Sequence, residues 1–122
     1  MTRHPDPVIE ATADQVRAWR DAGEILLVDV REPNEYAFER IHGALLYPLS
    51  TFDANALPRE GRRLVLHCAG GRRSLTAAHQ LQHAGHAQVT HLGGGLAAWK
   101  AAGFPVVRID AATGRVVDDG RA

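Results

Sequence analysis

The sequence predicts an α/β fold in which a parallel sheet is covered by helices on both faces. Short, continuous apolar runs alternate with amphipathic stretches along the chain, and the clearest runs are 24–30, 62–68 and 87–92. Such runs are typical of strands buried on both faces, and their alternation with helices is typical of a parallel sheet. Because ligands of these sheets bind beyond the carboxyl ends of the strands, we expect the functional residues there.

The first elements carry clear local signals. The segment 10–23 predicts a helix, because Thr12 and Gln15 have the spacing of a capping box. The apolar run 24–30 predicts a buried strand that closes near an aspartate. The segment 31–40 then predicts a short helix, since its proline stands at an early position where the missing N–H is harmless.

The rest of the chain continues this alternation. The expected elements are a turn and short extended segment at 41–50, a brief helix at 51–58, a strand at 62–68, a helix from about 73 to 84, a strand at 87–92 and a helix at 96–103. The helix over 73–84 should bury Leu75, Ala78 and either Leu81 or Gln82. The tail after these elements alternates weakly around a Thr-Gly turn, which is consistent with a small hairpin.

Length and charge restrict the function. The chain has 122 residues, 45% of them hydrophobic and 23% charged, and we assign residues 1–122 to one globular domain. The formal net charge is zero, which argues against nucleic acid or an anionic membrane as partner. The sequence has neither the apolar region of a signal peptide nor an apolar run long enough to span a membrane, so we expect a cytoplasmic protein.

The single cysteine of the chain stands in the segment HCAGGRRS, residues 67–74. Cys68 follows an apolar run and precedes two glycines and two arginines, so a strand, a glycine-rich turn and a helix start should meet there. Backbone N–H groups at a helix N-terminus attract an anion, and this setting lowers the pKa of a thiol. A buried cysteine that only packs would leave the paired arginines without a role, so we interpret Cys68 as a nucleophile.

Four segments together resemble the rhodanese (sulfurtransferase) family. In chain order they are LLVDVREPNEY (26–36), IHGALLYPLS (41–50), CAGGRRS (68–74) and LGGGLAAWKAAGFPV (92–106). Cys68, Gly71, Arg73 and Ser74 fill the pattern of the family's active-site loop, and the resemblance extends over about 8–107. The chain departs from the family pattern at Arg40, where a histidine is usual, and at His42, where a proline is usual. The segment is mostly structural in the family, so we expect an effect on local packing. The tail 108–122 has no counterpart in the pattern.

The resemblance implies a rhodanese-like fold of the single-domain type, with a mostly parallel sheet of about five strands. It also implies transfer of a sulfane sulfur through a persulfide on Cys68, without a cofactor. The donor would be thiosulfate, a small persulfide or a sulfur-loaded partner protein, and the acceptor would be cyanide or a thiol. The persulfide would be stabilised by backbone amides and the donor's sulfonate by arginines, and the implied binding residues are Ala69, Gly70, Gly71, Arg72, Arg73 and Ser74.

Other charged residues have simpler interpretations. Asp29 and Arg31 follow the first strand, and we expect a buried ion pair that supports the site. His79, His83 and His86 have a spacing that could hold a metal, but no carboxylate or thiolate stands beside them, so we predict no metal site.

Two other functions remain open. A cysteine-based phosphatase or arsenate reductase needs a longer loop between cysteine and arginine than the four residues found here. A binding module that keeps the fold without catalysis would not need the cysteine, glycines and arginine together.

Overall fold

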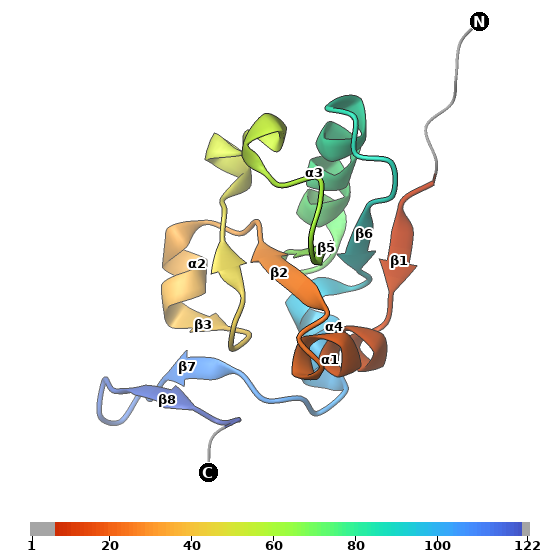
Figure 1. Ribbon diagram of the computed structural model, residues 1–122. Coiled ribbons are helices and arrows are strands. Elements are labelled where there is room, and N and C mark those ends of the chain that lie inside the picture. Colours follow the sequence, from red (N-terminus) through yellow and green to blue (C-terminus); the bar gives the residue numbers. More distant parts are fainter. Residues whose placement is uncertain (1–6, 121–122) are drawn as a thin grey trace, which may run out of the picture.

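Five strands form the central sheet in the order β1-β6-β5-β2-β4, and all their pairings are parallel (Figure 1). The computed structural model describes residues 7–120, so the ends of the predicted domain, 1–6 and 121–122, lie outside the described residues. The strands of this sheet are β1 (Ile9–Ala11), β2 (Ile25–Asp29), β4 (Leu45–Leu46), β5 (Arg63–His67) and β6 (Thr90–Leu92). The predicted α/β architecture with a mostly parallel sheet of about five strands is confirmed.

Helices cover both faces of this sheet. They are α1 (Ala13–Asp21), α2 (Pro33–Phe38), α3 (Arg72–His83) and α4 (Gly95–Ala101), with short 3₁₀ turns at Leu49–Thr51 and Ala54–Ala56. Helices α1 and α4 pack on one face, where Val16, Leu96 and Trp99 join one apolar cluster. Helix α3 packs on the other face, where Ala78 and Leu81 join a second cluster. The sheet is therefore the middle of three layers, as Figure 1 shows.

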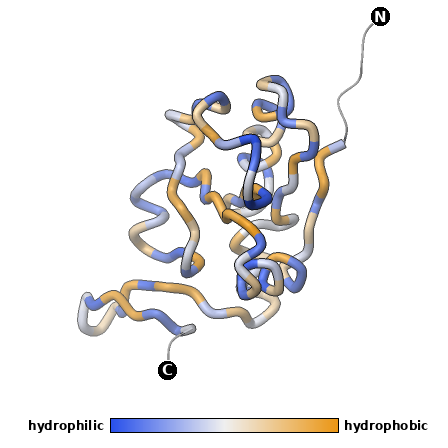
Figure 2. The backbone as a smooth tube through the Cα atoms, viewed as in Figure 1, coloured by the Kyte–Doolittle hydropathy of each residue, from blue (hydrophilic) through white to orange (hydrophobic). Residues whose placement is uncertain are grey.

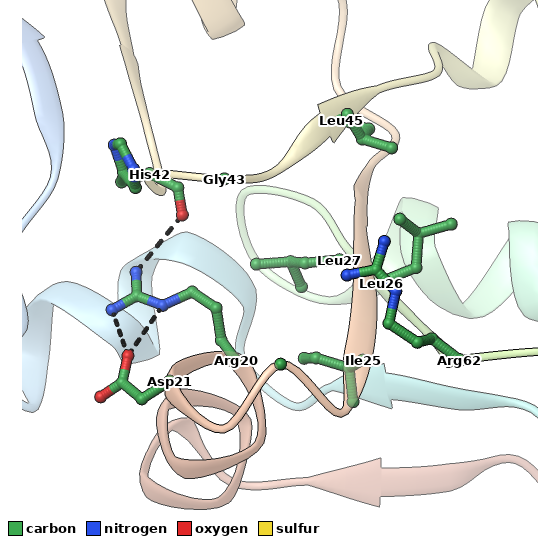
Figure 3. Close-up of a pocket in the computed structure, with 10 residues that line it drawn as sticks. Arg20, Asp21, Ile25, Leu26, Leu27, His42, Gly43, Leu45 and Arg62 are labelled. Atoms are coloured by element: carbon green, nitrogen blue, oxygen red, sulfur yellow. Dashed lines mark hydrogen bonds and ion pairs between the residues drawn. The ribbon is translucent and has the colours of Figure 1, made fainter.

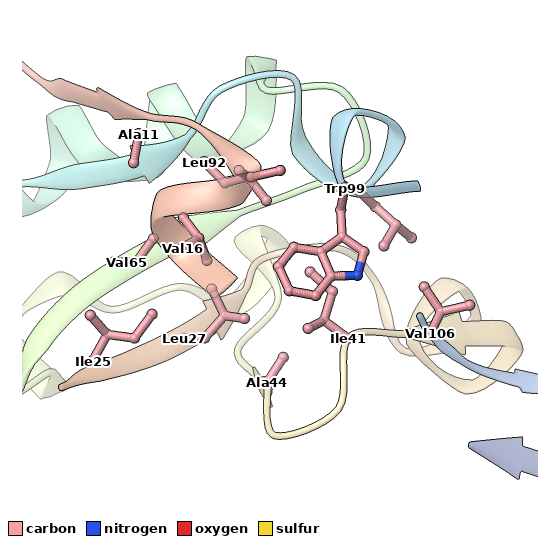
Figure 4. Close-up of a cluster of buried hydrophobic side chains, with 12 residues drawn as sticks. Ala11, Val16, Ile25, Leu27, Ile41, Ala44, Val65, Leu92, Trp99 and Val106 are labelled. Atoms are coloured by element: carbon pink, nitrogen blue, oxygen red, sulfur yellow. The ribbon is translucent and has the colours of Figure 1, made fainter. Parts of the chain in front are cut away.

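Trp99 organises the first cluster. Its side chain is completely buried, and Figure 4 shows the indole lying against Ile41 and close to Val106 and Leu27. The indole N–H donates a hydrogen bond to the carbonyl of Pro105 over 2.8 Å, so the polar atom is satisfied. Figure 2 shows that hydrophobic residues follow the central strands, whereas the outer loops are more hydrophilic.

A second, antiparallel sheet joins the end of the chain to its middle. It has the order β3-β7-β8, with β3 (Glu39–Arg40), β7 (Val107–Ile109) and β8 (Val116–Asp118). Arg40 lies opposite Val107 in this sheet, and His42 contacts the carboxylate of Asp118 at 2.7 Å. The two departures from the family pattern, Arg40 and His42, therefore both lie where the C-terminal hairpin attaches.

The structure differs from the sequence predictions in three elements. Strand β1 occupies residues 9–11, which we had assigned partly to the first helix. The brief helix expected at 51–58 is a 3₁₀ turn of three residues. Leu75 is 38% exposed, because α3 begins at Arg72 and its buried stripe runs through Ser74, Ala77, Ala78 and Leu81. The prediction that Leu75 is an inner residue is therefore wrong.

Candidate active site

The cysteine loop lies at the carboxyl end of β5. Cys68 follows the last residue of the strand, and α3 begins four residues later at Arg72. Asp29 ends the neighbouring strand β2 directly opposite His67, so the ends of both strands meet at this edge of the sheet. Cys68 is only 1% exposed, so its own loop and α3 shield the thiol from solvent.

The backbone conformation of the loop requires glycine at one position. Gly71 has a φ of 106°, in the left-handed region that side chains rarely adopt. A Cβ on Gly71 would also lie 3.3 Å from the backbone nitrogen of Gly94. By contrast, a Cβ on Gly70 would meet nothing within 4 Å, and its φ is not positive. The conformation of Gly71 lets its N–H donate a hydrogen bond to the Cys68 sulfur at 3.0 Å.

The surroundings of the sulfur lower the pKa of Cys68. Burial by itself raises the pKa of this thiol, because a buried thiolate loses its hydration. Hydrogen bonds from the Ser74 hydroxyl and from the backbone amides of Ser74, Gly71 and Gly70 act in the opposite direction, and the net shift is downward. Backbone donors at the start of α3 thus favour the thiolate, the nucleophilic form of cysteine.

Ser74 contacts both the thiol and a histidine that the sequence analysis did not select. Its hydroxyl oxygen lies 3.6 Å from the Cys68 sulfur and 2.9 Å from Nδ1 of His91. His91 is a residue of β6 and is only 4% exposed. No local signal in the sequence connects a histidine of one strand with a serine 17 residues earlier, because the contact depends on how α3 packs on the sheet.

The two arginines of the loop differ in their surroundings. Arg73 donates two hydrogen bonds to the carboxylate of Glu35, at 2.7 and 2.9 Å. These bonds, together with the charge of Arg73, lower the pKa of Glu35 to about 2, although burial opposes the shift. Arg72 is exposed at the first turn of α3. The carboxylate of Glu35 therefore partly compensates the positive charge of Arg73 near the sulfur. The sequence analysis did not predict this ion pair.

Asp29 and Arg31 form the buried ion pair that we expected at the end of β2. The Arg31 guanidinium donates to both carboxylate oxygens of Asp29 at 2.9–3.1 Å and to the carbonyl of Glu39 at 2.6 Å. The imidazole of His67 lies 3.6 Å from the same carboxylate. Burial lowers the pKa of His67 despite the charge of Asp29. These side chains connect the strand end with β3.

The second glycine-rich segment, 93–95, packs directly against the cysteine loop. The amide of Leu96 donates to the carbonyl of Cys68 at 2.8 Å, and the amide of Ala97 donates to the carbonyl of Ala69 at 3.0 Å. A Cβ on Gly95 would lie 2.4 Å from that Cys68 oxygen. We had interpreted the glycines only as a tight connection between strand and helix, but they also allow α4 to hold the loop.

A cavity of about 320 Å³ adjoins the loop. Ala69 of the loop, Glu35, Phe38 and Lys100 contribute to its walls, and Phe38 is 63% exposed. A second cavity, of about 440 Å³, lies near Ile25 at the opposite end of β2 (Figure 3). Of these two cavities, the first has a residue of the cysteine loop, Ala69, in its wall and the second has none.

Residues 7–120 have neither a metal-binding cluster nor a membrane-spanning helix. No group of three or more histidine, cysteine, aspartate or glutamate side chains in that range could hold a metal ion. No helix in the same range is long and apolar enough to cross a membrane.

Comparisons with known proteins agree on one family. The Rhodanese-like domain family matches residues 12–102. A sulfurtransferase of Allochromatium vinosum is 36% identical over 89 residues, which are 71% of this chain and 82% of that protein. The uncharacterized protein slr1261 of Synechocystis sp. is 46% identical over 90 residues, which are 73% of this chain but only 50% of that protein.

Solved structures show the same likeness. The crystal structure of thiosulfate sulfurtransferase from Pseudomonas aeruginosa is similar with a TM-score of 0.73 and 26% identity. The match covers 83% of this chain and 20% of that chain. The chain thus spans about half of the Synechocystis relative and a fifth of the Pseudomonas protein.

Proposed function

The chain belongs to the rhodanese-like domain family, and from this membership we propose that it is a sulfurtransferase acting through Cys68. The proposed reaction moves a sulfane sulfur from thiosulfate or a related persulfide donor to a thiophilic acceptor. The observation that carries the proposal is the buried thiol in a cradle of backbone amides, with its pKa lowered. The name of the Allochromatium relative supports the reaction class, and that of the Pseudomonas structure supports thiosulfate as donor.

The proposed mechanism has two displacement steps. In the first step the Cys68 thiolate attacks the outer sulfur of thiosulfate, the new S–S bond forms, and sulfite leaves with the electron pair of the broken bond. In the second step cyanide or a thiolate attacks the terminal sulfur of the persulfide and the Cys68 thiolate is released. Charge balances in both steps, so the chemistry needs no cofactor and no external oxidant.

Several residues have proposed roles around this centre. The amides from Ala69 to Ser74 would stabilise the persulfide anion in the position where Gly71 now contacts the sulfur. Arg73 keeps N–H donors beyond the two used by Glu35 and would bind the sulfonate, with Arg72 attracting the anion at the entrance. Asp29 and Arg31 would support the loop from the neighbouring strand end.

We further propose a small anionic sulfur donor, and a thiol or a partner protein as acceptor in the cell. We also propose the cytoplasm as location, because a reducing compartment keeps a cysteine such as Cys68 in the thiol form that the reaction needs. The short loop, with four residues between Cys68 and Arg73, supports a sulfur atom over a tetrahedral oxyanion as occupant.

The decisive experiment is intact mass spectrometry of the protein after incubation with thiosulfate, beside the Cys68→Ser variant. We expect a gain of about 32 Da, one sulfur atom, on the wild type only, and its removal by cyanide. Incubation with a phosphate ester serves as the control for phosphatase chemistry, and we expect no adduct and no turnover. A thiol that resists both sulfur donors and alkylation would contradict the proposal and favour the binding module.

Arg73→Ala tests the donor site. We expect the variant to lose thiosulfate turnover by about tenfold, the effect of about 1.4 kcal/mol of charge-assisted hydrogen bonding. Its reaction with neutral iodoacetamide should change much less, because no sulfonate is bound. Equal losses in both reactions would show that Arg73 only maintains the loop.

A further inference from the structure

A chain of polar contacts leads from the buried thiol to the surface. The Cys68 sulfur lies 3.6 Å from the Ser74 hydroxyl oxygen, which lies 2.9 Å from Nδ1 of His91. On the other side of the imidazole, Nε2 of His91 is 3.8 Å from a carboxylate oxygen of Glu10. The contacts join the cysteine loop, α3, β6 and β1 in one line.

Exposure changes sharply along this line. Cys68, Ser74 and His91 are 1%, 0% and 4% exposed, whereas the side chain of Glu10 is 70% exposed. A thiol with so little exposed surface has little direct contact with solvent that could take up its proton. The contacts through Ser74 and His91 provide a route for the proton that does not depend on this contact.

We propose that Ser74, His91 and Glu10 form a proton path for Cys68, in which His91 takes up the thiol proton through the serine. The Ser74 hydroxyl also donates to the carbonyl of Gly71 at 3.2 Å, so the relay begins when its O–H turns toward Nδ1 of His91. The S–H bond then breaks as its proton moves to the Ser74 oxygen, and the serine O–H proton moves to Nδ1. The products are a thiolate and an imidazolium, so charge is conserved. The Nε2 proton can then leave toward Glu10 and solvent. This proposal deepens the proposed sulfur transfer and rests on it for its purpose.

The environment of His91 suits a proton acceptor. Burial lowers the pKa of His91, the carboxylate of Glu10 on β1 raises it, and His79 on α3 lowers it, with a net downward shift. The downward shift favours the neutral imidazole, which has an unprotonated ring nitrogen that can accept a proton. On β5 the residue opposite His91 is the apolar Leu66, so that strand places no charge at the paired position.

The outer end of the path depends on a glycine of the run 93–95. A Cβ on Gly93 would lie 2.6 Å from Cγ and 2.9 Å from a carboxylate oxygen of Glu10. The missing side chain leaves room for Glu10 to fold over the end of β6 toward His91. Glu10 and His91 are also partners in the β1–β6 register, which brings them to the same face of the sheet.

The test is the rate of Cys68 alkylation by iodoacetamide as a function of pH. In the wild type, a proton shared between sulfur and imidazole keeps thiolate present below neutral pH, as in a cysteine and histidine ion pair. At about pH 6 we expect His91→Asn, which cannot take up a proton, to react about tenfold more slowly, the effect of one pKa unit. Ser74→Ala should lose at least as much.

The double variant makes the test specific. His91 acts only through Ser74 in this proposal, so Ser74→Ala/His91→Asn should be no slower than Ser74→Ala alone. Glu10→Gln should give a smaller decrease in the same direction, because the side chain is 70% exposed and only its charge is removed. His83 is an exposed histidine of α3, the helix that carries Ser74, so His83→Asn is the matched control and should react like the wild type.

Two results would overturn the path. One is a His91→Asn variant with the wild-type pH profile, and the other is a double variant whose losses multiply. If Ser74→Ala does not fold, Ser74→Thr takes its place. This variant keeps the hydroxyl, so we expect it to keep the wild-type pH profile of alkylation. The alkylation assay uses no sulfur donor, so its result does not depend on sulfur transfer. If thiosulfate fails to load Cys68, the proposed function is contradicted but the proton path is still tested by alkylation.

Discussion

Replacement of Gly95 by alanine tests how α4 holds the cysteine loop. The new Cβ would lie 2.4 Å from the carbonyl oxygen of Cys68 and 2.8 Å from the carbonyl carbon of Ala69. Both atoms belong to the backbone, so no side-chain rotation can relieve the contact. The amides of Leu96 and Ala97 hydrogen-bond these same carbonyls, so the loop and α4 must separate or shift together.

Two costs add up in Gly95→Ala. Gly95 has a φ of 59°, and a side chain in the left-handed region costs about 1–2 kcal/mol. Forcing extra volume into a packed contact costs about 1–3 kcal/mol more. Gly103 separates the two effects, because its φ is 80° but a Cβ there would meet nothing within 4 Å. We therefore expect a loss of about 2–5 kcal/mol for Gly95→Ala and about 1–2 kcal/mol for Gly103→Ala.

Urea unfolding measures both variants. With an m-value of about 2 kcal/mol/M, the midpoint should fall by about 1–2.5 M for Gly95→Ala and by about 0.5–1 M for Gly103→Ala. The rate of Cys68 alkylation under native conditions should change only in Gly95→Ala, because only this variant displaces the loop. Equal midpoints for the two variants, or an unchanged alkylation rate in Gly95→Ala, would refute the argument.

Three further perturbations test the contacts around the site and the core. Glu35→Gln should lower the free energy of unfolding at pH 7 by about 1 kcal/mol after solvent screening. Because the folded pKa of Glu35 is depressed from 4.5 to about 2, this stability is present above pH 4.5 and is lost as the pH falls toward 2. If the urea midpoints of the wild type and Glu35→Gln still differ at about pH 2, the ion pair with Arg73 is not the source of this stability. Arg31→Met leaves the fully buried carboxylate of Asp29 without its partner and should cost about 3–5 kcal/mol, measured by the same unfolding. A loss below about 1 kcal/mol would mean that Asp29 takes up a proton or reaches water instead. Trp99→Ala should cost about 3–5 kcal/mol in thermal or urea unfolding, and a small loss would show that the first cluster closes over the cavity.

Local signals in the sequence were sufficient for most elements of the fold. The capping box of α1 is present in the structure, with Thr12 and Gln15 bonding each other's backbone amides. Pro33 starts α2, as its early position indicated. The apolar runs became β2 and β5, which pair in parallel over five positions. Each of these features depends on residues within about one turn or one strand, where pattern and conformation are directly linked.

Features that depend on strand register could not be predicted in this way. Strand β1 is three residues long, lies at the edge of the sheet and pairs with a strand about 80 positions later, so it has no buried run to reveal it. The contacts of Arg73 with Glu35 and of Ser74 with His91 likewise join segments 38 and 17 residues apart. The prediction that Leu75 is buried was wrong because Ser74, the residue before it, occupies the inner position of the helix and is fully buried.

The burial of Cys68 changes what the site needs. From the sequence alone, a thiolate stabilised by amides requires no base, because an exposed thiol exchanges its proton with water. At 1% exposure the thiol has little direct contact with water, while the amides still determine how stable the thiolate is once formed. The fold must therefore both stabilise the anion and accept its proton. The amides at the start of α3 serve the first purpose. In the proposed path the imidazole of His91 accepts the proton through Ser74, and its positive charge then adds to the stabilisation of the thiolate.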